Sequence, residues 1–311
     1  MSEANDAADT FACCASCGIT EIDDIKLVPC DDCDLVRYCS NACREDHKSE
    51  HEEACNKRAA ELRDELLFKQ PDSNHWGDCP ICCVPLPLDP SRFVTFECCS
   101  KIICNGCMLA ITEQNTRRRL QHSCPFCREP TPDNDEEIEN LVTKRIEAND
   151  PYAMTDHGKR QYSKGDYRSA FENFTKAADL GNAEANNMLS VMYREGNVVG
   201  KDEGKMLYHL EEAAIGGHPK ARHNLGAHEY KNGNAEKAVK HFIIAANLGL
   251  DESIKALMNE FRTGHVSKEV LAAAFRAHKA AVDATKSPQR ELEEMFAMVK
   301  KAHDTARNGN C

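Results

Sequence analysis

The sequence predicts small zinc-stapled α+β modules followed by an all-α helical solenoid, and three observations lead to this fold class. Seventeen of the eighteen cysteines lie in the first 127 residues, mostly in pairs separated by two residues, a spacing that presents thiolates to tetrahedral zinc. Each cysteine-rich block is too short to build a sizeable apolar core, so metal has to hold it together. From residue 151 onward, a helical pattern recurs at intervals of about 32–36 residues.

Composition predicts a soluble protein, cytoplasmic or nuclear, whose partners are other proteins. The first ten residues are acidic and small, and no stretch reaches the roughly 18 apolar residues of a membrane span, so we expect no signal peptide, no transmembrane segment and no membrane partner. In a reducing compartment, paired cysteines are zinc ligands rather than disulfides. The net charge of -12 argues against nucleic acid as a partner. We expect residues 1–12 to form a disordered tail.

The first cysteine module spans residues 13–56 and carries eight candidate zinc ligands. They are Cys14, Cys17, Cys30, Cys33, Cys39, Cys43, His51 and Cys55. Eight donors make two closed four-coordinate sites, and closed sites are structural because no position is left for water. Cys13 is an alternative to Cys14, but its C-x3-C spacing fits less well. His47 lies one helical turn before His51, yet only His51 keeps the four-residue step to Cys55, so we expect His47 to be solvated.

The order of these spacings, with the "RYCS" at residues 37–40 and the H-x3-C ending, resembles the MYND-type zinc finger. That resemblance implies interleaved pairs, with one zinc on Cys14, Cys17, Cys39 and Cys43 and the other on Cys30, Cys33, His51 and Cys55. MYND fingers usually bind short proline-containing peptides with the help of a tryptophan, whose position is Lys48 here. Peptide binding and a zinc-stapled spacer therefore both remain open. Residues 57–76 are expected to be a helical linker.

The second cysteine module spans residues 77–130 and again carries four ligand pairs. They are Cys79 and Cys82, Cys98 and Cys99, Cys104 and Cys107, and Cys124 and Cys127. The layout resembles a RING-type zinc finger, and "CPFCR" at residues 124–128 is its most specific piece. The resemblance implies one zinc on Cys79, Cys82, Cys104 and Cys107, which brings the expected total to four zinc ions.

The third ligand pair departs from the RING pattern. The family's histidine falls on Lys101, whose ammonium group has no lone pair to give. The simplest alternative uses Cys98 and Cys99 together with Cys124 and Cys127, although adjacent ligands require a bent backbone. Cys83 is a reserve donor that could replace Cys98.

The RING resemblance also implies a mechanism. RING-type ubiquitin ligases bind a ubiquitin-charged conjugating enzyme and hold its thioester in a reactive arrangement, so they catalyse by positioning. Here Ile81, Ile111 and Pro125 occupy the positions of the apolar shelf for the conjugating enzyme, and Arg128 occupies that of the cation that bridges to ubiquitin. The alternative is that both isoleucines fill a small core and that Arg128 is solvated.

The C-terminal half reads as helices throughout. The helical periodicity of residues 131–150 predicts a connecting helix, and the acidic residues at its start suit the helix dipole. In residues 151–285, Tyr-x-x-Gly recurs at Tyr162, Tyr193 and Tyr230, and Ala-Ala-x-x-Gly ends three further helices. Glycine closes helices and alanine permits close helix packing, so a helix pair is repeated. In residues 286–311, Ser287 and Pro288 start a terminal helix. Its expected buried face consists of Leu292, Met295, Val299 and Ala302.

These helix pairs resemble Sel1-like repeats, relatives of the tetratricopeptide repeat, with an insertion around "NVVGKD". Such solenoids present a surface to other proteins. The whole order resembles multidomain proteins abundant in diatoms and related algae. The leading hypothesis is a RING-type ubiquitin ligase whose partners are a conjugating enzyme, ubiquitin and an unidentified substrate held by the repeats and possibly the MYND finger. The competing hypothesis is a non-enzymatic zinc-binding adaptor or scaffold.

Overall fold

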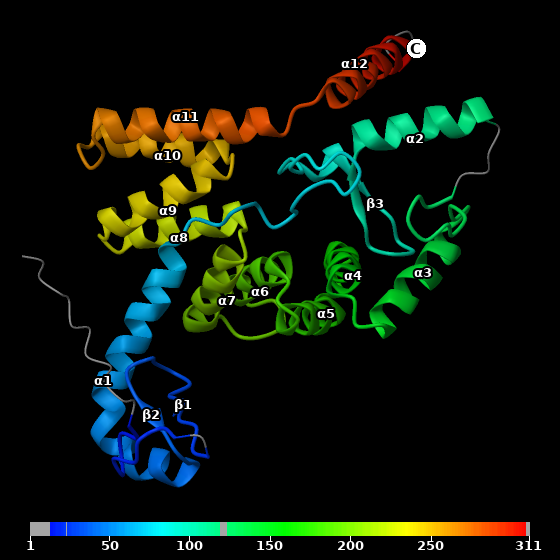
Figure 1. The fold of residues 1–311 in the computed structure, drawn as a ribbon. Helices are drawn as coiled ribbons and strands as arrows, with labels where there is room; N and C mark the ends of the chain where they lie inside the picture. The colour runs from blue at the N-terminus through cyan, green and yellow to red at the C-terminus, as the bar shows by residue number, and fades with distance from the viewer. Residues whose placement is uncertain (1–12, 23, 119–122, 309–311) are drawn as a thin grey trace, which may run out of the picture. The chain divides into compact units, whose positions relative to one another are not determined.

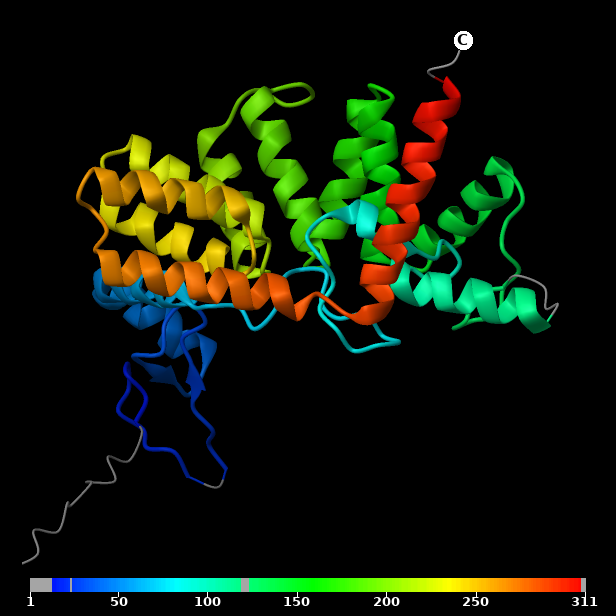
Figure 2. The ribbon, with the colours of Figure 1, turned by 90° about the horizontal axis from the view of Figure 1, so that it is seen from above.

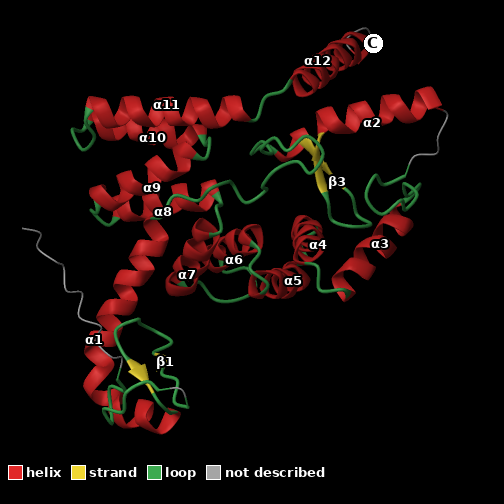
Figure 3. Cartoon of the chain, viewed as in Figure 1, coloured by secondary structure: helices red, strands yellow, loops and turns green. Residues whose placement is uncertain are grey.

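The computed structural model describes residues 13–22, 24–118 and 123–308, with side chains up to residue 299 (Figure 1). The expected tail at residues 1–12 lies outside the described residues. The chain divides into two compact units, an N-terminal unit of residues 1–69 and a C-terminal unit of residues 70–311. Coloured by secondary structure, the described part is mainly helical, with two short two-stranded sheets (Figure 3).

The N-terminal unit packs around its cysteines. Strands β1 (Val28–Pro29) and β2 (Arg37–Tyr38) pair antiparallel, and helix α1 (Asn41–Phe68) follows. The Ser40 hydroxyl caps α1 by accepting from the amide of Cys43 at 3.3 Å, which fixes that cysteine in the first helical turn. The buried core is composed mainly of the candidate ligands, with few apolar residues beside them: Cys14, Leu27, Cys30, Cys33, Tyr38 and Cys55.

The expected helical linker is helical over only part of its length. Helix α1 runs without a break from the first cysteine module to Phe68, and residues 69–77 that follow contain no helix. Lys69 ends the helix in an extended conformation, two residues before Pro71, which disfavours helical backbone in the residue preceding it.

The second cysteine module begins the C-terminal unit. A short 3-10 helix η1 (Pro90–Arg92) leads into strand β3 (Phe93–Thr95), which pairs antiparallel with β4 (Ile102–Cys104), and helix α2 (Asn105–Arg118) follows directly. Its buried core again combines cysteines with a few apolar side chains: Cys79, Leu86, Ile102, Ile103, Cys104 and Cys107. Helix α3 (Asp135–Glu147) then connects to the repeats, as the sequence predicts.

The repeats are helix pairs stacked side by side. The bounds are α4 (Pro151–Ser163), α5 (Tyr167–Asp179), α6 (Ala183–Glu195), α7 (Glu203–Ile215), α8 (Pro219–Lys231), α9 (Ala235–Asn247) and α10 (Asp251–Arg262). Figure 2 shows the pairs following one another along the unit. Gly181, Gly217 and Gly249 between successive pairs have φ angles of 80, 78 and 90°, which is the left-handed region that favours glycine. The predicted insertion forms the longer loop between α6 and α7.

A size-matched contact recurs inside the pairs. Gly158 of α4 faces Phe174 of α5, and Gly226 of α8 faces Phe242 of α9; in both cases a methyl group on the glycine would lie 2.7 Å from a ring carbon. The equivalent eighth residues of the middle pair are Ser190 in α6 and Leu210 in α7, both buried. In the middle pair, the larger serine replaces glycine on the first helix and the smaller leucine replaces phenylalanine on the second helix. The total side-chain volume at this position is therefore nearly conserved.

The last two helices are α11 (Lys268–Ala284), which packs on α9 and α10, and α12 (Pro288–Asn308), which lies against α2 (Figure 2). Helix α12 begins at the predicted proline, but the expectation that its apolar face is buried is wrong. Leu292, Met295 and Val299 are 44, 64 and 68% exposed. Helix α12 contacts α2 near its start, and this contact does not cover the apolar face. The Ala302 side chain lies outside the described residues. Within the described part of the chain, no helix combines the length and apolar character needed to cross a membrane.

Gly226→Ala should lower the free energy of unfolding of the repeats by about 1–3 kcal/mol, because the added methyl group overlaps the Phe242 ring. The measurement is urea unfolding followed by far-UV circular dichroism. In a Phe242→Leu background the penalty should shrink, since the ring is gone. Gly200→Ala is the control, because open space surrounds Gly200. Equal effects of the two alanine substitutions would contradict the packing argument.

Candidate metal centres

Three cysteine pairs share one backbone turn, which we call the cysteine knuckle: the pairs beginning at Cys14, Cys79 and Cys124. In each, the amide of the first cysteine donates to the carbonyl oxygen five residues later, at 2.8, 3.0 and 2.8 Å. The residue after the second cysteine has a positive φ angle; these residues are Gly18, Cys83 and Arg128, at 74, 53 and 65°. The turn brings both thiols to the same side. Because it occurs in both cysteine modules, the second module presents its thiols in the same way as the first.

The first centre consists of Cys14, Cys17, Cys39 and Cys43, whose sulfur atoms all lie within 4.8 Å of one another. The Sγ atoms of Cys17 and Cys39 are 3.6 Å apart, as are those of Cys39 and Cys43. Zinc–sulfur bonds of about 2.3 Å in a tetrahedron separate the sulfur atoms by about 3.8 Å. The four thiols therefore have the spacing of a tetrahedral zinc site. Cys13 is exposed and lies outside this group.

The second centre consists of Cys30, Cys33, His51 and Cys55, all buried. Sγ of Cys30 lies 3.7 Å from Sγ of Cys55, and Sγ of Cys33 lies 3.2 Å from Nε2 of His51. The expectation that His47 is solvated is wrong. Its side chain is only 19% exposed, because Nδ1 lies 3.1 Å from the Tyr38 hydroxyl and the ring stacks on His51. His47 supports the ring of His51 and does not join the ligand group.

The third centre consists of Cys79, Cys82, Cys104 and Cys107. Cys104 ends strand β4 and Cys107 lies in the first turn of α2, so the strand-to-helix junction sets their spacing. The Sγ atoms of Cys79 and Cys107 are 3.8 Å apart, and those of Cys82 and Cys104 are 3.9 Å apart. These separations again match the edges of a zinc tetrahedron.

The fourth centre contains the adjacent pair Cys98 and Cys99 together with Cys124 and Cys127. The bend that adjacent ligands require is present: the amide of Ser100 donates to the carbonyl of Phe96 at 2.7 Å, and Ser100 has a φ of 55°. Sγ of Cys98 then lies 3.3 Å from Sγ of Cys127, and Sγ of Cys99 lies 3.6 Å from Sγ of Cys124. Lys101 and Cys83 are both exposed and take no part in the group.

The electrostatics of these centres favour a cation. Neighbouring thiols and burial raise the pKa of Cys39 to about 12, and burial together with Cys30 raises the pKa of Cys55 to about 12. Thiols this close resist ionising together, whereas a divalent cation binds them as thiolates. With four donors each, the centres leave no open coordination position for chemistry. The donors fit zinc; the binding of four ions stays a prediction.

The sequence reasoning missed one residue at the third centre, Arg290 of α12. Its side chain is buried, and its guanidinium donates to the carbonyl oxygens of Val84 and Pro85 at 3.0 and 2.7 Å and to Sγ of Cys82 at 3.7 Å. A methyl group on Gly106 would lie 2.8 Å from the backbone at the start of α12, so this glycine permits the close approach of α2. Arg290 thus fixes the knuckle from outside the metal shell and offsets its negative charge.

The residues predicted to contact a conjugating enzyme lie in three places. Ile81 sits in the knuckle of the third centre and is 43% exposed. Pro125 and Arg128 belong to the knuckle of the fourth centre, and both are exposed. Ile111 differs, because it is half-buried on α2 and packs against the core of the second module.

Comparisons with known proteins match separate segments of the chain. Residues 14–55 match the MYND finger, and residues 151–182, 183–218 and 219–250 each match the Sel1 repeat. The N-terminal unit thus contains a MYND finger, and the C-terminal unit contains an all-helical solenoid of Sel1 repeats. These matches leave residues 77–130 outside. No curated protein matches the chain.

Similar solved structures include a Sel1 repeat protein from Oxalobacter formigenes, with 22% identity and a TM-score of 0.42 over 54% of this chain and 80% of that one. A protective antigen of uropathogenic Escherichia coli strains that displays an SLR fold has 22% identity and a TM-score of 0.41, over 48% of this chain and 34% of that one.

The cysteine centres of the purified chain should hold four zinc ions, so elemental analysis should return at least four, and Cys98→Ser and Cys99→Ser should each lose one, because each removes a thiolate from the fourth centre. Cys83→Ser should retain all four, since this thiol lies outside the groups. Chelation should unfold both cysteine modules but leave the helical signal of the repeats, because metal binding and folding are coupled in such small modules. Two or fewer zinc ions in the unsubstituted chain would rule out one of the modules as described.

Arg290→Met should speed the release of one zinc ion to a competing chelator by about 10-fold or more, because outer contacts of a metal site typically contribute that much. The remaining ions should leave at unchanged rates. Arg276→Met, on the exposed surface of α11, is the charge-matched control. Identical release from both variants would show that Arg290 does not support the third centre.

Proposed function

We propose that this protein is an adaptor for protein–protein interactions, in which the Sel1 repeats bind a client protein and the cysteine modules serve as further docking modules. The observation that carries this proposal is the closed character of the metal centres: all sixteen donors fall into four groups of four, so each module is a metal-stapled surface rather than a reaction centre. When bound, zinc crosslinks the loops of each cysteine module, because the small apolar core of the module cannot hold these loops together alone.

A second, more specific function is favoured by the knuckles of the second module. Ile81 and Pro125 lie between the two cysteines of their knuckles, and both side chains are exposed to solvent, where a partner can reach them. Exposed apolar side chains on a rigid turn make suitable anchors for a protein interface. We therefore propose that the second module is a RING-type finger that recruits a ubiquitin-conjugating enzyme.

The backbone at Arg128 adds support to this ligase function. Its φ of 65° is a conformation in which glycine has no steric penalty and arginine does. The guanidinium is exposed directly after the last candidate ligand, where a planar five-donor cation can bridge to an acceptor on ubiquitin. In this proposal, Arg128 acts by holding the ubiquitin against the conjugating enzyme, and no group of this chain exchanges a bond with the substrate.

An autoubiquitination assay with a panel of conjugating enzymes tests the ligase function. Arg128→Ala and Arg128→Gly should both lower ubiquitin transfer while leaving binding of the conjugating enzyme intact, and the glycine variant should be at least as stable as the parent because glycine suits the left-handed backbone. Ile81→Ala should weaken binding itself by roughly 1–3 kcal/mol through loss of an apolar anchor. Arg118→Ala, exposed at the end of α2, is the charge-matched control.

Two outcomes separate the proposed functions. If the parent transfers ubiquitin and the Arg128 and Ile81 variants remain fully active, the positioning mechanism is wrong. If the parent is inactive with every conjugating enzyme, the adaptor function stands alone. In that case, affinity capture with the parent chain should recover partner proteins, and the Gly226→Ala variant, whose repeats are loosened, should recover fewer of them. Recovery of identical partners by the parent and the variant would count against client binding by the repeats.

A further inference from the structure

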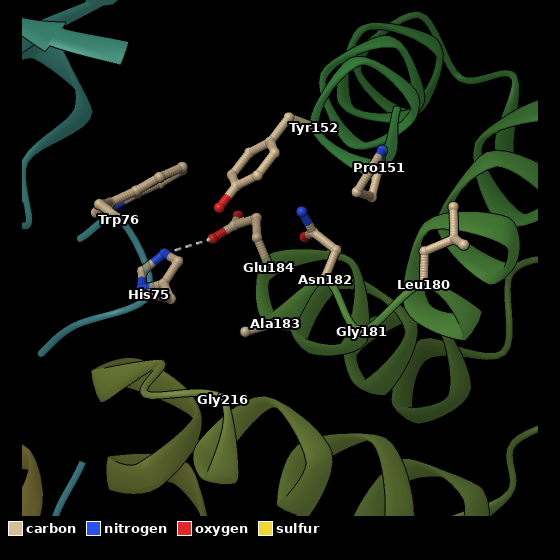
Figure 4. A pocket seen from close by; sticks show the side chains of 10 residues that line it. All are labelled: His75, Trp76, Pro151, Tyr152, Leu180, Gly181, Asn182, Ala183, Glu184 and Gly216. Carbon is tan, nitrogen blue, oxygen red and sulfur yellow. Dashed lines mark ion pairs between the residues drawn. The ribbon is translucent and has the colours of Figure 1, made fainter. Parts of the chain in front are cut away.

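Three ionisable side chains outside the cysteine centres converge in the C-terminal unit. His75 lies in the segment before the second module, Glu184 in the first turn of α6, and His218 at the N-cap of α8. One donor atom of each lies within 4.8 Å of the others. Their side chains are 7, 14 and 5% exposed, in the order given. Figure 4 shows the imidazole of His75 pointing toward the carboxylate of Glu184.

The distances centre on a single carboxylate oxygen. Oε2 of Glu184 lies 2.9 Å from Nε2 of His218 and 3.2 Å from Nε2 of His75. Neither ring nitrogen of His75 makes an aligned hydrogen bond with any described residue, although both are buried. Buried polar atoms without partners are rare in proteins, and they call for a ligand or an ion.

The backbone holds His75 in place. Its amide donates to the carbonyl of Gly217 at 3.1 Å, and Asn74 bonds to Trp76 and to Leu86 at 2.9 Å each. Gly217 allows this approach, since a methyl group there would lie 2.7 Å from the carbonyl oxygen of Ser73. The imidazole is therefore presented on a fixed segment, which suits a preorganised site.

We propose that His75, Glu184 and His218 bind a divalent transition metal ion, with zinc the best match to two imidazoles and one carboxylate. Bonds of about 2.0–2.1 Å in a tetrahedral site separate nitrogen and oxygen donors by about 3.3 Å, close to the separations from Oε2 of Glu184 to the two imidazole nitrogens. The other carboxylate oxygen, Oε1, accepts from Nζ of Lys159 at 2.6 Å, so Oε2 is the oxygen that faces the two imidazoles. A ligating carboxylate is commonly held by such an outer hydrogen bond.

The ionisation states agree with this arrangement. Burial lowers the pKa of His75 to about 4, so at neutral pH its imidazole keeps a free lone pair. Although burial opposes ionisation of Glu184, the hydrogen bond from His218 and the nearby charge of Lys159 help to hold the pKa of this carboxyl well below its usual range.

The alternative is a purely hydrogen-bonded link. His218 Nδ1 now accepts from the amide of Ala221 at 3.2 Å, which places the imidazole proton on Nε2, facing Glu184. Metal binding through Nε2 moves that proton to Nδ1 and gives up this one capping bond. A single long capping bond is a small loss beside three metal–ligand bonds. All three side chains also line a cavity of about 440 Å³, from which a water molecule could supply a fourth ligand.

The test uses the full chain with its cysteine centres loaded with zinc and cobalt(II) as the probe. Equilibrium dialysis should show uptake of one further ion, with visible absorption typical of nitrogen and oxygen ligands and without the intense thiolate-to-cobalt band. Glu184→Gln and His75→Gln should each weaken this uptake by about 10-fold or more, because they remove a ligand. His209→Gln, which alters another half-buried histidine of the repeats, is the matched control and should bind as the parent does.

Three results would overturn the metal site: no uptake of a further ion, uptake that Glu184→Gln and His75→Gln do not weaken, or a spectrum showing that cobalt has entered the cysteine centres. Thermal unfolding by circular dichroism checks that each variant is folded. His75 lies outside the helices, so His75→Gln keeps the test decisive if Glu184→Gln fails to fold. Because the readout is metal binding alone, it is independent of the adaptor and ligase functions.

Discussion

The spacing of sulfur atoms is the constraint on which the first 130 residues depend. Four thiols cannot be held a few ångströms apart and ionised together unless a cation lies among them, and the cores of both modules are built largely from these same cysteines. Metal binding therefore replaces the apolar burial that larger domains use. The shared knuckle turn shows how little backbone is needed: two hydrogen bonds and one left-handed residue present a pair of thiols, whether that residue is Gly18, Cys83 or Arg128.

The repeats solve the opposite problem, since residues 151–285 contain no cysteine and the helix pairs rely on packing. Their helices are nearly equal in length, so each position of one pair has a counterpart in the next. Gly158 and Phe174, Ser190 and Leu210, and Gly226 and Phe242 occupy equivalent positions of the three pairs and divide the side-chain volume differently between the two helices. Such complementary exchange keeps the pairs stackable while their sequences differ. The stacked pairs also align the starts of α6 and α8 along one side of the repeats. The segment around His75 lies against this side, where the His75 amide bonds to Gly217.

Much of this fold could be predicted from the sequence, because cysteine spacing and helical periodicity are local signals. The grouping of the ligand pairs followed from a family resemblance, and the helix start at Pro288 followed from the fixed φ of proline. Features that depend on distant contacts could not be predicted. Arg290 has no pattern around it, His75 resembles any linker histidine, and the exposure of the α12 apolar face depends on where α2 meets it. For His47 a local contact was overlooked, since Tyr38 lies only nine residues away.

The contact between Arg290 and Cys82 also has a consequence for the order of synthesis. The two residues are 208 positions apart, and the arginine leaves the ribosome long after the cysteine. During translation, the third centre can gather its cysteines long before its outer contact exists, so the nascent module would hold its metal less firmly than the finished one. A chain that stops before α12 would lack the hydrogen bonds that Arg290 donates to the carbonyl groups of Val84 and Pro85. Helix α12 thereby couples the firmness of the third centre to a segment that is synthesised 208 positions later.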